Sequence, residues 1–143
     1  MKTLLALLPF AFALAAPAFA DNLMDGRWYT EGVEDDLHLQ SVIDDRPDGT
    51  FVKSIRNGTD CEAISSWVET GTWTFDGKHY VETTETVSGE KPDAAAGAVK
   101  DAFDVAPIDD THVALTDAKT QITWTFTRVD PNFTMSPPKD CTV

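Results

Sequence analysis

Large apolar side chains alternate with threonine along two stretches of this chain. In residues 120–129, Trp124 and Phe126 fall on one face and threonines on the other. Residues 65–75 repeat the pattern, with Trp73 among the apolar positions, and Gly71 within this stretch predicts a bend or a bulge. A period of two places one face of an extended chain in a core and the other in solvent. Both stretches are therefore predicted to be half-buried β-strands.

Turn-forming Asp, Asn, Gly and Pro residues recur every ten or so positions and separate short runs rich in Thr, Val, Ile and aromatic residues. Consecutive strands with short connections favour an up-and-down meander, and eight strands can close into a barrel without exposed edges. A β-sandwich is the alternative, although its Greek-key crossings usually need longer connections. The predicted fold is an all-β, eight-stranded antiparallel barrel with strands at residues 26–32, 36–43, 49–56, 63–75, 79–88, 100–107, 111–117 and 120–129.

The first twenty residues have a different pattern. Lys2 precedes an uncharged apolar run from Leu4 to Ala16, and small residues at Ala18 and Ala20 follow. These are the regions of a secretory signal peptide. A membrane anchor is the alternative, but the run is shorter than the roughly 20 residues that span a bilayer. We expect residues 1–20 to be removed and residues 21–143 to form one exported domain, periplasmic or secreted, with no stable membrane anchor.

The charge of the chain narrows the choice of partners. It contains 24 acidic and 11 basic residues, which gives a formal net charge of −13. Such a surface repels phosphate backbones, so nucleic acid is not an expected partner. Solubility explains the acidity more simply than attraction of a basic partner does.

Two cysteines, Cys61 and Cys141, lie in the predicted exported domain. An oxidising compartment favours a disulfide between them. Closing a loop of about 80 residues would stabilise the fold by about 4 kcal/mol in the chain-entropy model. A zinc or redox site is the alternative, but the spacing matches neither a CxxC pair nor a four-ligand set.

Short motifs then suggest a family. The sequence Gly26-Arg27-Trp28 opens the domain, residues 124–128 (Trp-Thr-Phe-Thr-Arg) close it, and a second Gly-x-Trp strand turns through Asp-Gly at residues 69–78. These features resemble the lipocalin (calycin) family, in particular small bacterial exported domains. The resemblance implies that Trp28 seals the closed end of the barrel and that Arg128 packs across its ring. A disulfide that ties the C-terminal tail to the barrel is also common in that family.

No catalytic set is evident in the sequence. The three histidines form no metal-binding pair, and the clusters 34–36, 44–45 and 109–110 are interpreted as solvated turns. A phosphate-binding glycine loop and a nucleophile elbow are also missing. We therefore expect a non-enzymatic protein without a cofactor or a bound metal.

The predicted interior is rich in aromatic residues. Alternation places these side chains inside the barrel: Trp28, Leu37, Leu39, Phe51, Ile55, Trp67, Trp73, Phe75, Phe103, Val105, Val113 and Leu115. The same faces include Glu69 and Lys53. Because a buried charge needs a partner, we expect them at the open mouth, and the alternative is contact with a polar group of a ligand. The predicted ligand-binding residues are Trp67, Glu69, Trp73, Phe51, Lys53 and Leu39.

Three functions are compatible with this pattern. The first is an exported protein that binds a small apolar molecule in the barrel mouth. The second is a protease or lysozyme inhibitor, or another module that binds a protein partner, for which an acidic surface would suit a basic target. The third is a structural component of the cell envelope. A cavity open to solvent would favour the first.

Overall fold

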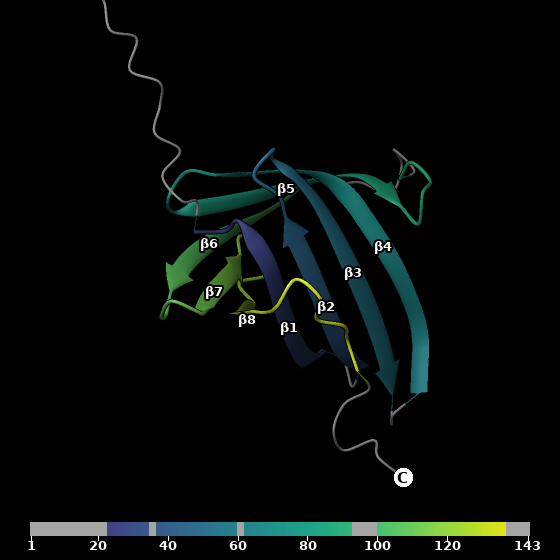
Figure 1. Cartoon of the computed structure of the whole chain (residues 1–143). Coiled ribbons are helices and arrows are strands. Elements are labelled where there is room, and N and C mark those ends of the chain that lie inside the picture. Colours follow the sequence, from purple (N-terminus) through teal and green to yellow (C-terminus); the bar gives the residue numbers. More distant parts are fainter. Residues whose placement is uncertain (1–22, 35–36, 60–61, 93–99, 137–143) are drawn as a thin grey trace, which may run out of the picture.

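The computed structural model describes residues 23–34, 37–59, 62–92 and 100–136. Eight antiparallel strands close into a barrel, which confirms the predicted fold class (Figure 1). No helix long and apolar enough to cross a membrane occurs among these residues. The strands are β1 (Gly26–Glu34), β2 (Leu37–Asp45), β3 (Thr50–Thr59), β4 (Glu62–Phe75), β5 (His79–Val87), β6 (Lys100–Pro107), β7 (His112–Asp117) and β8 (Thr123–Arg128).

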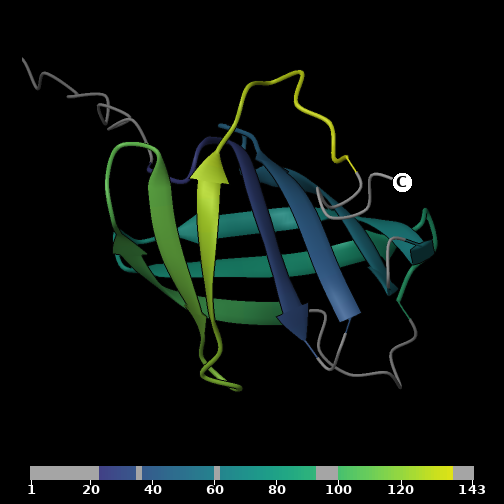
Figure 2. The same ribbon diagram turned by 90° about the horizontal axis from the view of Figure 1, so that it is seen from below.

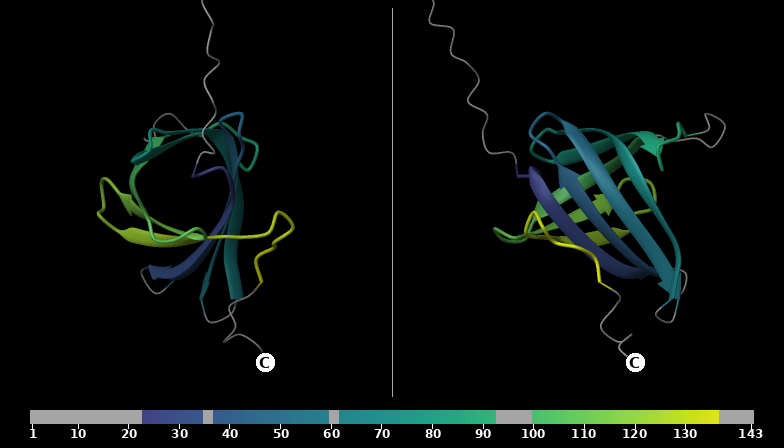
Figure 3. Two further views of the ribbon diagram at one scale, coloured as in Figure 1. Left: turned by 60° about the vertical axis from the view of Figure 1, so that its left-hand side comes forward. Right: turned by 45° about the vertical axis from the view of Figure 1, so that its right-hand side comes forward.

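Each strand pairs with the next one in sequence, and β8 returns to lie beside β1 (Figure 2). Trp28 pairs with Arg128 in this closing contact, and Tyr29 pairs with Thr127. The last strand begins at Thr123 rather than at residue 120, because the chain is still turning at Gln121, where φ is 61°. Seen along the barrel, the strands surround one common axis (Figure 3).

Gly71 marks a bulge in β4, as the sequence predicts. The register between β4 and β5 shifts between Thr70 and Gly71. A Cβ atom at Gly71 would lie 2.0 Å from the carbonyl oxygen of Thr83 and 3.0 Å from Cε1 of Phe51. The two strands can approach this closely only because position 71 has no side chain.

The closed end of the barrel is built around Trp28, which is 1% exposed. Its indole nitrogen donates a hydrogen bond to the carbonyl oxygen of Met24 at 2.8 Å. The guanidinium of Arg128 lies 4.3 Å from the centre of the Trp28 ring and donates to the carbonyl oxygens of Asp25 and Leu23. Stacking and fixed carbonyl acceptors together allow a charged group at the edge of an apolar core.

The chain that follows β8 crosses the outer face of β1 and β2 (Figure 1). Arg27 donates a hydrogen bond to the carbonyl oxygen of Phe133, and Gln40 donates to that of Ser136. The rings of Tyr29 and Phe133 lie 5.0 Å apart. The tail is therefore attached to the barrel by its own contacts. The predicted signal peptide and the predicted Cys61–Cys141 disulfide lie outside the described residues.

Candidate ligand cavity

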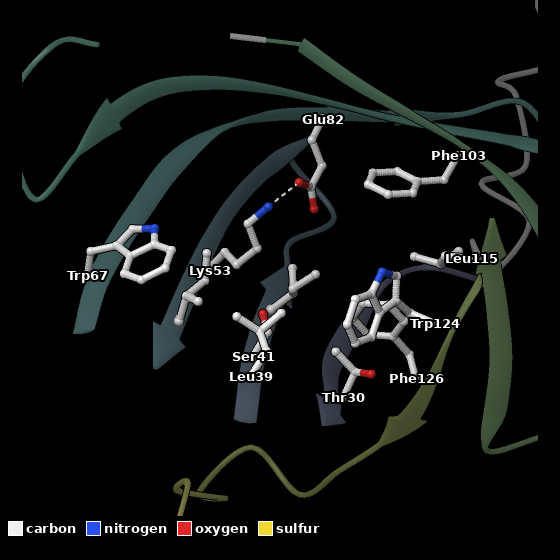
Figure 4. Close-up of a pocket in the computed structure, with 12 residues that line it drawn as sticks. Thr30, Leu39, Ser41, Lys53, Trp67, Glu82, Phe103, Leu115, Trp124 and Phe126 are labelled. Atoms are coloured by element: carbon white, nitrogen blue, oxygen red, sulfur yellow. Dashed lines mark hydrogen bonds and ion pairs between the residues drawn. The ribbon is translucent and has the colours of Figure 1, made fainter. Parts of the chain in front are cut away.

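A cavity of about 210 Å³ occupies the interior beyond the packed end of the barrel. All eight strands contribute to its wall (Figure 4). The cavity is open to the surface, and four of its lining residues are partly exposed: Leu39, Trp67, Phe103 and Trp124. The lining consists of Thr30, Leu39, Ser41, Ile43, Lys53, Ile55, Trp67, Glu82, Phe103, Leu115, Trp124 and Phe126.

The structure places the six predicted ligand-binding side chains in three different positions. Leu39, Lys53 and Trp67 line the cavity. Phe51 and Trp73 belong to the buried core beside it. Trp73 is fixed there by its indole nitrogen, which lies 3.1 Å from the carbonyl oxygen of Thr50. The sixth residue, Glu69, does not line the cavity but forms an ion pair with Lys53, which does.

Lys53 is held between two carboxylates. Its Nζ lies 2.5 Å from Glu82 and 3.1 Å from Glu69. The side chains of Lys53, Glu69 and Glu82 are 13%, 18% and 2% exposed, so these charges are shielded from water by the barrel. Glu69 also accepts a hydrogen bond from Trp67 Nε1 at 2.9 Å. Lys53 and Glu69 are register partners on β3 and β4, so the two predicted charges contact each other and, with Glu82, form an internal ion cluster.

The electrostatics of Lys53 follow from these neighbours. Burial lowers the pKa of an ammonium group, but the charges of Glu82 and Glu69 outweigh burial and raise the pKa of Lys53. Lys53 therefore remains protonated at neutral pH.

Tyr80 connects this ion cluster to a second carboxyl group. Its hydroxyl lies 2.9 Å from Oδ1 of Asp45 and 3.1 Å from Oε1 of Glu82. Burial raises the pKa of Asp45 to about 8, more than the hydrogen bond from Tyr80 lowers it. The single hydroxyl proton of Tyr80 is thus shared between two acceptor side chains, Asp45 and Glu82. The interpretation of Asp45 as a solvated turn residue is wrong, because it ends β2 facing Tyr80 and is 2% exposed.

Sequence reasoning missed Glu82 and Ser41. Along β5, the buried residues Tyr80, Glu82 and Thr84 occupy every second position. The same alternation that identified the inward faces of other strands could therefore have placed Glu82 inside the barrel. Ser41 had no such signal. It is 5% exposed and lines the cavity, and its hydroxyl forms no hydrogen bond within the described part of the chain.

The raised pKa of Asp45 predicts an unusual pH dependence of stability. Folded Asp45 keeps a proton that the unfolded chain releases above its ordinary pKa of 3.8. This contribution is complete below pH 3.8 and is lost as the pH rises through about 8. We expect the free energy of unfolding to fall across this range by up to about 1.4 kcal/mol per pH unit, and Asp45→Asn to remove the slope.

Urea unfolding at pH 4.5, 6 and 8 measures this effect. Asp104→Asn is the control, because that carboxylate is 61% exposed. Hydrogen bonds from backbone amides of His79 and Thr111 lower the pKa values of Asp76 and Asp109, so those groups change stability only at lower pH. Identical slopes in Asp45→Asn and the wild type would contradict the assignment.

Fold and cavity together define a structural class. The chain is a closed eight-stranded antiparallel β-barrel with an internal cavity, an architecture compatible with a lipocalin-like fold. Comparison with protein-family models finds no match, and comparison with curated protein sequences likewise finds none. Within the described residues, no group of three or more His, Cys, Asp or Glu side chains is arranged to hold a metal ion.

Proposed function

We propose that this protein is a non-enzymatic binding protein that holds one small, mainly apolar ligand in the barrel cavity. The observation that carries the proposal is the cavity itself, which measures about 210 Å³ and reaches the surface between partly exposed aromatic residues. An apolar cavity of about 150 Å³ accepts benzene in another protein. The space here suits a ligand of one or two fused rings.

The proposal includes no chemical step. The ionisable side chains at the cavity already engage one another, since Lys53 bridges Glu69 and Glu82, and Tyr80 lies between Glu82 and Asp45. These contacts hold a few polar atoms at fixed positions in the cavity wall. In small-ligand sites, polar groups placed in this way orient the ligand and provide specificity.

Kinship with the calycins and export are part of the same proposal. The stacking of Arg128 on Trp28, next to Gly26 with φ of 117°, supports kinship with calycins. The pattern of residues 1–20 supports export by a signal peptide. An intact mass that begins at Asp21 in the exported protein would support this part.

A neutral aromatic probe tests the binding function. Isothermal titration calorimetry with 2-naphthylmethanol is expected to give saturable one-site binding. Leu39→Trp should weaken it at least tenfold, because the larger side chain would occupy the cavity mouth. Val68→Trp is the matched control, since Val68 is 41% exposed and does not line the cavity. Absence of binding to the wild type, or equal binding by both variants, would overturn the proposal.

A further inference from the structure

We infer that the cavity selects an amphipathic organic cation: a compact aromatic or apolar body that carries a protonated amine. This inference rests on the proposed binding function and specifies the ligand's chemical class. It is carried by the uneven composition of the internal ion cluster, in which Lys53 faces both Glu69 and Glu82.

The charges of the cluster do not balance. One ammonium lies against two carboxylates, so the three side chains carry a formal charge of about −1. The cationic end of Lys53 is already engaged by both acids. A ligand carboxylate would therefore add a third anion to a partly desolvated site, where like charges repel more strongly than in water. A ligand cation would neutralise the surplus.

The cluster also has more hydrogen-bond acceptor sites than donors, which again favours a ligand that donates. Each carboxylate offers about four lone-pair sites. Glu82 receives contacts only from Lys53 and Tyr80, and Glu69 only from Lys53 and Trp67, among the described residues. Acceptor sites remain on both acids, and a ligand ammonium with three N–H donors can use those of Glu82, which lines the cavity.

The positions of the groups match such a ligand. Figure 4 shows the Glu82 carboxylate projecting from β5 into the space between Lys53 and Phe103. Trp124 lies on the same side of the cavity as Phe103. An ammonium beside Glu82 would thus lie near aromatic rings, whose faces attract cations when water is excluded.

A polar atom without a partner lies in the same wall. Ser41 lines the cavity on β2, two residues before Ile43, which is the register partner of Lys53. Ser41 is only 5% exposed, yet its hydroxyl forms no hydrogen bond to any residue that the structure describes. A polar ligand atom offers this hydroxyl a partner, which a purely hydrocarbon ligand would not.

Three probes of nearly equal shape separate charge from size: 2-naphthylmethylamine, 2-naphthylmethanol and 2-naphthoate. Calorimetric titration of the wild type at pH 7 is expected to show the protonated amine binding at least tenfold more tightly than the alcohol. The carboxylate should bind at least tenfold more weakly than the alcohol. Glu82→Gln should reduce the ratio of amine affinity to alcohol affinity at least tenfold.

Two further variants keep the test decisive. Glu69→Gln repeats it at the more exposed acid if Glu82→Gln fails to fold. Asp101→Asn removes an acid that does not line the cavity and should keep the preference. Three outcomes would overturn the inference and leave the binding function intact. They are equal affinities for all three probes, tighter binding of the carboxylate than of the amine, and an unchanged preference in both glutamine variants. Failure of all three probes to bind would overturn both.

Discussion

Replacement of Lys53 by methionine is expected to lower the free energy of unfolding by about 3–5 kcal/mol, because it leaves the buried Glu82 and the partly buried Glu69 without their shared cation. Methionine is similar in length and apolar, so packing around the stem is largely retained. Glu82, at 2% side-chain exposure, loses a contact that water cannot replace. Equilibrium urea unfolding of the variant and the wild type at pH 7 measures the difference.

A second substitution tests the assigned cause. Adding Glu82→Gln to Lys53→Met removes one of the two unpaired charges, so the double variant should be more stable than Lys53→Met alone. Lys119→Met is the control, since its ion pair with Asp101 is 3.7 Å long and exposed, and we expect a change below about 1 kcal/mol. Equal losses in Lys53→Met and Lys119→Met would show that the internal ion cluster does not stabilise the barrel.

Replacement of Gly71 by alanine is the second large effect, with an expected loss of about 3 kcal/mol or more. The new Cβ would lie 2.0 Å from the backbone oxygen of Thr83, and a backbone atom has no rotamer by which to move aside. Relief requires β4 and β5 to separate at the bulge, next to Phe51 in the core. Thermal and urea unfolding both report this loss.

Two variants on the same hairpin provide the comparison. Thr72→Ala alters an exposed side chain next to the bulge and should be nearly neutral. Gly77→Ala meets no atom within 4 Å, but φ is 96° there, so only backbone strain of about 1 kcal/mol is expected. If Gly71→Ala were as mild as Gly77→Ala, the close approach of the two strands would not be the reason for the glycine.

The ion cluster also bears on function. Replacing a buried ion pair by packed apolar residues is often neutral or stabilising, so such a cluster is weak evidence of a need for stability. Lys53 and Glu82 line the cavity, and Glu69 forms an ion pair with Lys53. Charged groups at this position are what the proposed ligand recognition requires.

Local patterns predicted the strands well. Eight strands, their order and the bulge at Gly71 all follow from turn residues and from alternation, which report on neighbours along the chain. The same alternation placed Trp124 and Phe126 inward, as observed. The starting point of β8 was missed, because the turn that displaces it depends on the backbone conformation of Gln121.

For every strand except β5, the sequence by itself determined which face points inward, because the side-chain period of two is a property of the extended backbone. It did not determine how far along the barrel axis each inward side chain lies. That depth depends on the register between strands, which brought Glu82 from β5 to Lys53 on β3 and placed Asp45 under Tyr80. Only the closed tertiary structure, by combining these registers, decided that the charges meet inside the barrel and that a cavity remains beside them.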